Sequence, residues 1–301
     1  MKLIVILGPT ASGKTGLATQ LACRIGGEVI SADSRQVFRR MTIGTGKDLS
    51  DYDIDGVMVP YHLIDILEPG SEFSVFDFQQ AFLTAFREIS SRKKIPVLCG
   101  GTGLYLESVL KPYLFHEVPE NINLRADLSG KSDEELISVL QNLKTLHNTT
   151  DTVSRERILR AIEIEVFQQQ QPGNAAFPDI DAIVFGIKIE RKKQIRLIKE
   201  RLKNRLDAGM IGEVESLLKE GISPARLKNY GLEYKFITQF ILGEIDYLNL
   251  FIALNRAIHR FSKRQMTWFR RMEKNGIKIN WIEGDLPMDE KLKKIIQLMN
   301  G

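Results

Sequence analysis

The chain has 301 residues, of which 43% are hydrophobic and 27% are charged, and its formal net charge is +4. This composition is typical of an ordinary globular protein, and the length accommodates one large domain or a core with a smaller lobe. The apolar run that follows Met1 and Lys2 is too short for a signal peptide, and no later run is long enough to span a membrane.

Cys23 and Cys99 are the only cysteines in the chain. They fall in a predicted helix and a predicted strand, where buried free thiols are the expected form. No cluster of cysteine and histidine has the spacing of a zinc site. From these features we expect a cytoplasmic protein.

A phosphate-binding loop is predicted at residues 8–15, which match the pattern G-x-x-x-x-G-K-[ST]. An apolar strand is predicted over Leu3–Leu7, and a helix is predicted to start near Gly13. This arrangement directs backbone N–H groups, a positive helix end and the Lys14 ammonium at one anion, and it places the Thr15 hydroxyl to bind Mg²⁺. The residues of this phosphate loop are Gly8, Pro9, Thr10, Ala11, Ser12, Gly13, Lys14 and Thr15. The pattern indicates phosphate or diphosphate, but not specifically ATP or a kinase.

A candidate catalytic carboxylate follows the second predicted strand, which covers residues 28–30. Because ligands of open α/β sheets bind at the carboxyl ends of the strands, Asp33 is expected on the same rim as the phosphate loop. Its carboxylate suits a general base or a water-mediated ligand of Mg²⁺. Asp is also a favoured helix N-cap, and the spacing leaves these roles open.

Two further strands are predicted over residues 61–66 and 95–99, on either side of an amphipathic helix over residues 76–89. His62 is expected to have a structural role in the first of them. The second strand runs into Gly100–Tyr105, a glycine-rich turn that allows a ligand to approach the backbone. No acidic residue ends this strand, where many nucleotide triphosphatases have an aspartate that positions Mg²⁺. This absence argues against an ATPase.

Several segments, in this order, resemble the tRNA dimethylallyltransferases, also called isopentenyl-tRNA transferases. They are GPTASGKT at residues 8–15, ISADSRQ at 30–36, IGTGK at 43–47, YHLIDI at 61–66, GGTGLY at 100–105, RILRAIE at 157–163 and KRQMTWFR at 263–270. The resemblance covers most of the chain, except roughly residues 112–150 and the C-terminal end. With the strand and helix pattern, it implies an α/β fold with a P-loop core, a parallel sheet flanked by helices and a small inserted helical lobe.

The predicted core comprises residues 1–111 and 180–301, and the predicted lobe comprises residues 112–179. The resemblance implies that this lobe contacts the anticodon arm of tRNA. The lobe is shorter than is usual in the family, and the Asn-Asp-Pro that typically precedes its arginines reads Val153-Ser154-Arg155.

Two helices are predicted in the lobe. The first covers Asp133–Leu143 and has Ser132 as its candidate N-cap. The second covers residues 155–167 and has several arginines, which suit either a solvated surface or RNA contact. The resemblance favours RNA contact for Glu156–Arg160.

A basic helix is predicted over Lys192–Ala208, after a strand over Ala182–Ile189. Arg201 and Arg205 lie four residues apart on one face of this helix. Two guanidiniums on one face suit a diphosphate or a phosphodiester. The resemblance implies that arginines matching these two bind the diphosphate leaving group. It also covers Gly231–Lys235 loosely, and we expect no particular role for that segment.

The stretch Arg256–Arg271 is the strongest nucleic-acid signal, because it is basic, lacks acidic residues and contains Phe261, Trp268 and Phe269. Basic residues neutralise phosphates, and aromatic faces stack on unpaired bases. The aromatic residues could equally form the core face of an amphipathic helix, and this is what we expect of Phe261.

These features favour transfer of a dimethylallyl group from dimethylallyl diphosphate to N6 of an adenine in tRNA. The resemblance implies adenosine 37, beside the anticodon, as the target. Asp33, Thr102 and Arg201 are the expected catalytic residues, with Asp33 as the base for the amine proton and Arg201 as a stabiliser of the leaving charge. The resemblance implies that Gln36 and Thr102 orient the flipped adenine.

The expected partners are a tRNA anticodon stem-loop, dimethylallyl diphosphate and Mg²⁺, bound by a monomeric protein. The residues expected to contact tRNA are Asp33, Ser34, Arg35, Gln36, Thr102, Arg125, Glu156, Arg157, Ile158, Leu159, Arg160, Arg260, Lys263 and Arg264.

Three alternatives remain open at this point. A P-loop kinase acting on a nucleoside or another small molecule would use the same core, but it would not need the basic helix. A prenyltransferase acting on free adenine nucleotides would keep the chemistry and lack salt-sensitive RNA binding. An RNA-binding protein with an inactive phosphate site would not bind diphosphate.

Overall fold

The computed structural model describes residues 2–111, 117–145, 150–170 and 177–300. The chain divides into two compact units. We call residues 1–112 together with 178–301 the core unit, and residues 113–177 the insert unit.

The core unit contains a six-stranded sheet in which every strand pair is parallel. In spatial order its strands are β5 (Tyr61–His62), β2 (Glu28–Ala32), β6 (Pro96–Gly100), β1 (Leu3–Leu7), β7 (Ala182–Lys188) and β8 (Ile279–Glu283). The central strands β2, β6 and β1 are fully buried, which explains why each is a continuous apolar run. The predicted α/β class with a parallel sheet is confirmed.

The strand register places three predicted site segments side by side. Gly100 at the end of β6 pairs with Ala32 on one side and with Leu7 on the other. The segments that follow β2, β6 and β1 therefore leave the sheet at the same level. A Cβ on Gly100 would lie 2.3 Å from the carbonyl oxygen of Ala32, so only glycine fits at this position.

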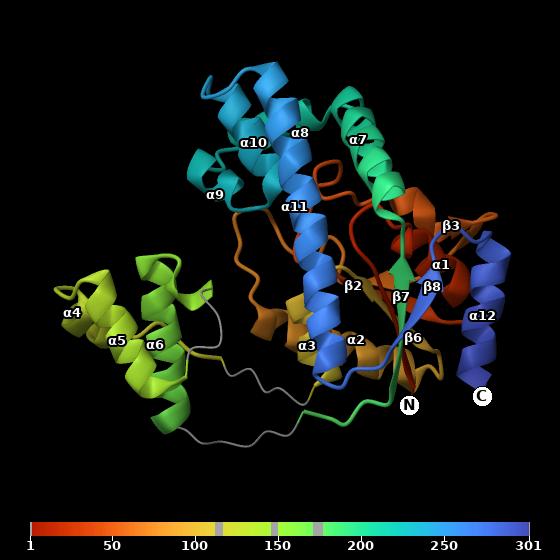
Figure 1. The fold of residues 1–301 in the computed structure, drawn as a ribbon, viewed down its shortest axis with the longest axis horizontal. Coiled ribbons are helices and arrows are strands. Elements are labelled where there is room, and N and C mark those ends of the chain that lie inside the picture. Colours follow the sequence, from red (N-terminus) through yellow and green to blue (C-terminus); the bar gives the residue numbers. More distant parts are fainter. Residues whose placement is uncertain (1, 112–116, 146–149, 171–176, 301) are drawn as a thin grey trace. The chain divides into compact units, whose positions relative to one another are not determined.

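Helices cover both faces of the sheet. Helices α1 (Lys14–Ile25) and α12 (Met288–Asn300) pack on the face to which Ile4 and Ile6 point. Helices α2 (Val75–Ser91) and α3 (Gly103–Leu110) lie on the opposite face (Figure 1). Because side chains alternate along a strand, the two helical layers bury the two sets of apolar residues of β1.

A second helical group packs beyond the carboxyl ends of the strands (Figure 1). Its helices are α7 (Arg191–Asp207), α8 (Met210–Lys219), α9 (Pro224–Lys228), α10 (Leu232–Ile241) and α11 (Tyr247–Lys274). They share a hydrophobic core with Val37, Phe38 and Met41 from the segment after β2. This group therefore encloses the rim of the sheet on which the site residues lie.

The strand predicted over residues 61–66 is shorter than expected. Strand β5 ends at His62, because Leu63 and Asp65 adopt positive φ angles of 62° and 54°, which a strand does not accommodate. His62 itself bonds Glu28 through its Nε2 atom at 2.8 Å, a structural role. Between β2 and β5 lie the short helix η1 (Leu49–Tyr52) and the hairpin of β3 (Asp53–Ile54) and β4 (Val57–Met58).

The insert unit is helical. It contains α4 (Ile122–Leu128), α5 (Asp133–Leu143), η2 (Thr150–Thr152) and α6 (Arg155–Gln170). Ser132 caps α5 in a capping box with Glu135, as the sequence predicts. Helix α4 was not predicted.

Both cysteines are free thiols, and Cys99 is buried. Within the residues that the structure describes, no helix has the length and apolar character needed to cross a membrane.

Candidate anion-binding and RNA-binding site

The phosphate loop connects β1 to α1. Gly13, the N-cap residue of α1, has a φ angle of 76°, and no side chain caps this end of the helix. The first turn of α1 contains no acidic residue. Its N–H groups and the positive end of the helix dipole are therefore available to an anion.

Two glutamines hold the phosphate loop at Thr10. The Thr10 N–H donates to Oε1 of Gln265 at 2.8 Å, and the Thr10 carbonyl accepts from Nε2 of Gln194 at 3.3 Å. Both glutamine side chains are buried. These roles could not be predicted from local sequence, because each glutamine is far from Thr10 along the chain.

Lys14 is partly buried beside charged groups from two other segments, namely Asp33 after β2 and the arginine pair of α7. Burial lowers the pKa of its ammonium, and Arg201 and Arg205 lower this pKa further, whereas Cys99 and Asp33 oppose the shift. The structure therefore brings together Lys14, Asp33, Arg201 and Arg205, which the sequence predicted as separate candidates. An anion that binds here would relieve the repulsion between the three cations.

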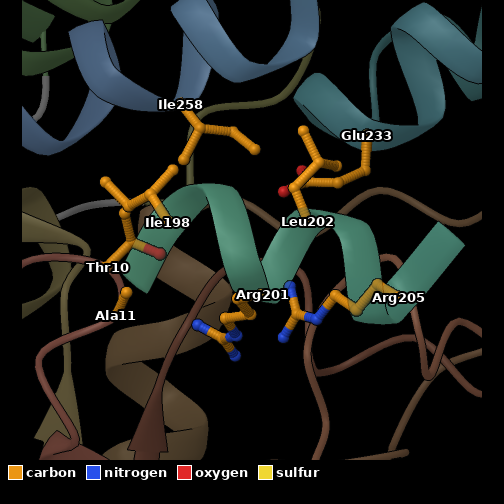
Figure 2. A pocket seen from close by; sticks show the side chains of 8 residues that line it. All are labelled: Thr10, Ala11, Ile198, Arg201, Leu202, Arg205, Glu233 and Ile258. Atoms are coloured by element: carbon orange, nitrogen blue, oxygen red, sulfur yellow. The ribbon is translucent and has the colours of Figure 1, made fainter. Parts of the chain in front are cut away.

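The arginine pair extends from one side of α7 (Figure 2). Arg201 Nη2 lies 3.3 Å from Asp48 Oδ2, and Arg205 Nη2 lies 3.8 Å from the same oxygen. Burial and then the nearby Arg201 lower the pKa of Arg205 to about 10. Within the described part of the chain, the buried Nη2 of Arg205 has no hydrogen-bond partner. This guanidinium is therefore ready to donate to a bound anion.

A pocket joins the arginine pair to the phosphate loop (Figure 2). It is lined by Thr10, Ala11, Ile198, Arg201, Leu202, Arg205, Glu233 and Ile258. Glu233 comes from the segment to which the sequence assigned no role, and burial raises the pKa of its carboxyl group. Burial thus makes this carboxyl group easier to protonate than that of an exposed glutamate.

The glycine-rich segment 43–47 forms a wall of the arginine site. Glu213 on α8 accepts hydrogen bonds from the N–H groups of Thr42, Ile43 and Gly44, and from the hydroxyl of Tyr234 at 2.6 Å. A carboxylate that accepts several such bonds holds a loop firmly in one conformation.

Gly46 and Lys47 have structural roles in the same segment. A Cβ on Gly46 would lie 1.7 Å from Arg205 Nη2, so only glycine allows this approach. Lys47 is buried and donates to the Phe38 carbonyl at 2.6 Å and to Asp65. The segment therefore shapes the arginine site. The Lys47 ammonium is already engaged in hydrogen bonds within the core unit.

Asp33 follows β2 directly and is partly exposed. Its Oδ1 accepts the N–H of Arg35 at 2.9 Å, which forms a local side-chain turn. The next described helical element is η1, which begins at Leu49, so Asp33 is not a helix N-cap. Of the roles expected for Asp33, those of general base and ligand of Mg²⁺ are compatible with this position.

The other residues expected near the adenine lie on the same rim. Gln36 accepts from the Ser31 hydroxyl at 2.9 Å and donates to the Gly46 carbonyl at 3.2 Å, so its amide orientation is fixed. Thr102 is the N-cap residue of α3, but its side chain makes no capping hydrogen bond. Ser34 is partly exposed, and burial lowers the pKa of Arg35, against the influence of Asp33.

Helix α11 has two distinct faces. Ile258, Ser262, Gln265 and Phe269 are buried on one face. Exposed basic residues occupy the other face, which we call the basic face and which comprises Arg256, Arg260, Lys263, Arg264 and Arg270. The basic side chains expected to contact RNA are thus available to a polynucleotide phosphate backbone.

The aromatic residues of α11 differ from the expectation. Phe261 is 38% exposed rather than buried, while Phe269 is fully buried. Trp268 donates from Nε1 to Glu107 at 3.0 Å, and the Arg271 guanidinium lies 3.9 Å from the centre of its ring. The expectation for Phe261 was wrong, because the side of the helix that faces the core is formed by residues 258, 262, 265 and 269.

The arginines of the insert unit divide into paired and exposed groups. Arg125 and Arg160 bind the buried carboxylate of Glu163 at 2.7 Å and 3.2 Å. Burial alone would raise the pKa of Glu163, but its hydrogen bonds, chiefly from Arg125, lower it. Arg157 is exposed. Ile158 is only 1% exposed and packs in the core of the insert unit, so RNA contact by the stretch Glu156–Arg160, which stays a prediction, would not use this side chain.

A phosphate loop at the end of a parallel strand, a facing arginine pair and a basic helix define a P-loop protein whose clustered cations suit a diphosphate-like anion. Family models agree with this class. The IPP transferase model matches residues 36–272, and the isopentenyl transferase model matches residues 1–62. The chain belongs to the IPP transferase family, which is the family of the tRNA dimethylallyltransferases.

Curated relatives match nearly the whole chain. A tRNA dimethylallyltransferase 2 of Bacteroides fragilis is 52% identical over 98% of this chain and 97% of its own length. A protein of the same name from Pelobacter propionicus is 55% identical over 94% of this chain and 90% of its own. The resemblance found in the sequence is thereby confirmed.

Solved structures share the fold. The tRNA isopentenylpyrophosphate transferase of Bacillus halodurans superposes with a TM-score of 0.73 at 31% identity, covering 100% of this chain and 96% of that one. A eukaryotic dimethylallyltransferase, described as acting on tRNA, superposes with a TM-score of 0.76 at 21% identity, covering 94% of this chain and 74% of that one.

Proposed function

We propose that the protein transfers the dimethylallyl group of dimethylallyl diphosphate to N6 of adenosine 37 in tRNA and releases diphosphate. The observation that supports this most is the meeting of Lys14, Arg201 and Arg205 at the phosphate loop, in a chain of the IPP transferase family. The expected compartment is the cytoplasm, where tRNA is modified, and the expected state is a monomer.

The cations at the phosphate loop would stabilise the leaving group. As the bond between the allylic carbon and the diphosphate oxygen breaks, its electron pair leaves with the diphosphate. The Lys14 ammonium and the two guanidiniums face the negative charge that develops there. The N–H groups at the start of α1 add further donors that are already in place.

Mg²⁺ would bind at the end of the phosphate loop. Thr15 begins the first turn of α1 beside Lys14, and its hydroxyl, with the oxygens of the diphosphate, supplies ligands of the type that Mg²⁺ takes. Asp33 offers a carboxylate on the same rim, either directly or through water. The ion would neutralise charge on the diphosphate.

Asp33 is our candidate for the general base. The N6 amine forms the new carbon–nitrogen bond and must release a proton, for which a carboxylate near the site is suited. The side chains of Gln36 and Thr102 lie on the same rim and are proposed to orient the flipped adenine.

The RNA would bind over the basic face, through Arg260, Lys263 and Arg264 among others. Further contacts are proposed from Ser34 and Arg35 in the core unit. In the insert unit they are proposed from Glu156, Arg157 and Leu159, next to the Arg125, Arg160 and Glu163 network.

The proposal is tested by transfer of radiolabel from dimethylallyl diphosphate, with Mg²⁺, into an anticodon stem-loop with unmodified adenosine 37. Free AMP and a stem-loop with guanosine at this position serve as controls. We expect label in the adenosine stem-loop alone. Label in AMP alone would indicate a nucleotide prenyltransferase, and ATP-dependent phosphorylation without prenyl transfer would indicate a kinase.

The role of Asp33 has its own test. Asp33→Asn should slow transfer by about 10²–10⁴-fold, the range expected for a lost general base, while stem-loop affinity stays unchanged. A variant with normal turnover would remove Asp33 from this role.

A further inference from the structure

Gln265 lies between the two glycine-rich loops of the site. Its side chain accepts from the Thr10 N–H at 2.8 Å and donates to the Gly101 carbonyl at 2.9 Å. A peptide N–H only donates and a carbonyl only accepts, so these partners fix the orientation of the amide. One side chain of α11 therefore bonds both the phosphate loop and the turn after β6.

The Gln265 amide approaches the turn after β6 at a position that glycine leaves open. A Cβ on Gly101 would lie 2.4 Å from Gln265 Nε2 and 3.1 Å from the Gly8 carbonyl oxygen. A side chain at Gly101 would therefore displace the amide, and moving α11 away from this turn would break at least one of the two hydrogen bonds.

The bond to Thr10 also supports an unfavourable backbone conformation. Ala11, the next residue, has a φ angle of 60°, which costs a residue other than glycine about 1 kcal/mol or more. Gln265 and Gln194 together bond the N–H and the carbonyl of Thr10. They therefore hold the phosphate loop in the shape that binds an anion.

The same helix exposes the basic face on its other side. Lys263 and Arg264, the two residues before Gln265, are exposed, whereas Gln265 is only 7% exposed. The continuous helix α11, which covers Tyr247–Lys274, is a rigid connection between the surface that faces a polynucleotide and the loop that faces a diphosphate.

We propose that Gln265 is a positioning residue that fixes the phosphate loop to α11, so that RNA on the basic face and diphosphate in the loop strengthen each other's binding. The inference rests on the proposed function, because the RNA is the substrate proposed above. Coupling of this kind is reciprocal, and it requires that the ordered arrangement of α11 and loop binds both ligands better.

The test measures the affinity for inorganic diphosphate with Mg²⁺, alone and with a saturating anticodon stem-loop. In the unchanged protein we expect the stem-loop to tighten diphosphate binding by about 5-fold or more, the lower end of measured coupling. Gln265→Met keeps the length of the side chain and loses both hydrogen bonds. It should weaken diphosphate binding and abolish the enhancement.

Two further variants serve as controls for Gln265→Met. Gln80→Met changes an exposed glutamine of α2 and should leave both quantities unchanged. Gln265→Glu keeps the acceptor for Thr10 but places a carboxylate oxygen against the Gly101 carbonyl and a negative charge beside the loop. It should also weaken diphosphate binding and lower the enhancement, and it replaces Gln265→Met if that variant does not fold.

The outcomes distinguish this inference from the proposed function. If Gln265→Met retains both the diphosphate affinity and the enhancement, the inference is wrong, whatever happens to its thermal midpoint. If the unchanged protein shows no enhancement, the coupling is wrong. If no label reaches the stem-loop, the proposed function fails, and diphosphate binding without RNA still decides whether Gln265 positions the loop.

Discussion

Arg205 has a guanidinium that the surrounding side chains and backbone do not fully satisfy. Its Nη2 atom is buried and lacks a hydrogen-bond partner among the described residues, and a buried unsatisfied polar group costs about 1–3 kcal/mol. Residues that lower stability in this way are common at functional sites. The diphosphate proposed above would supply the missing acceptor.

This cost gives a prediction for Arg205→Leu. The free energy of unfolding of the ligand-free variant should equal or exceed that of the unchanged protein. Affinity for diphosphate should fall about 10- to 100-fold, the range for lost hydrogen bonds to a charged group. Chemical denaturation and calorimetric titration measure the two quantities. Arg196→Leu, at an exposed position of the same helix, is the control. A large loss of stability with intact binding would show that Arg205 is structural.

Lys14 gives a prediction on pH. Only the ammonium form attracts diphosphate, and burial lowers the pKa of this group below its usual value. As the pH rises, Lys14 should therefore lose its proton at a lower pH than an exposed lysine, and diphosphate affinity should fall in that range. Titration between pH 7 and pH 10 checks this. Lys14→Arg keeps its charge there, so its affinity should not show the same fall; an identical fall would assign the effect to another group.

At the scale of elements, local patterns predicted local structure. The segment from β1 through the phosphate loop to α1 could be predicted because its strand, glycines and helix are contiguous. Strand β5 ends before the predicted residue because Leu63 and Asp65 have left-handed backbone conformations. Neither residue is a glycine, so the sequence did not indicate these conformations. Helices α8, α9 and α10 were not predicted, and Glu233 was therefore missing from the expected site.

Long-range contacts set the limit of the sequence prediction. Glu213, Gln265 and Gln194 bond the site loops across sequence separations of 171, 255 and 184 residues, and nothing in their local sequence identifies those partners. The candidate residues of the phosphate loop, Asp33 and the arginine pair could be named in advance. These residues could be named because each belongs to a short contiguous motif or has a partner four residues away on one helix face.

Glu213 gives a prediction at this scale. Glu213→Ala should release the segment 42–44, because three backbone N–H groups lose their acceptor. We expect faster amide exchange in residues 42–47 and weaker diphosphate binding, since this segment contacts the arginine pair. Glu215→Ala, an exposed position of the same helix, should change neither. Unchanged exchange in residues 42–47 of Glu213→Ala would contradict this role for the carboxylate.

The basic face gives a second prediction. Lys263→Gln and Arg264→Gln should each reduce the slope of log affinity against log salt for stem-loop RNA by about 1, because each removes one phosphate contact. Fluorescence anisotropy at several salt concentrations measures the slope. Lys219→Gln, on the exposed side of α8, serves for comparison, and an equal slope in all four proteins would exclude this face as the RNA site.

At the scale of the whole molecule, the two units have separate hydrophobic cores. The insert unit packs Leu136, Leu140 and Ile162 among its own helices, while the sheet and its helices enclose the anion site in the core unit. The division places the proposed leaving-group chemistry in one unit and part of the proposed RNA contact in the other.

This division gives the last prediction. Leu136→Ala should destabilise the insert unit by about 2–5 kcal/mol, the usual cost of emptying a buried leucine site. Amide exchange should then increase in residues 117–170 only. The affinity of Leu136→Ala for the stem-loop should fall, while its affinity for diphosphate should not change. The comparison variant Leu17→Ala, in the core of the other unit, should lower the affinity for diphosphate. A loss of diphosphate affinity in Leu136→Ala would show that the units do not act separately.

The order of the strands has a consequence for the synthesis of the protein. A growing chain has made β1, β2, β5 and β6 by residue 100, so four neighbouring strands and the phosphate loop precede the insert unit. The arginine pair, Glu213 and Gln265 follow it. Until α11 leaves the ribosome, the phosphate loop lacks Gln265, one of the two glutamines that hold it, even though the arginine pair of α7 has already been made. A chain that stops before α11 would fold part of the sheet and have no complete site, which ties activity to completed translation.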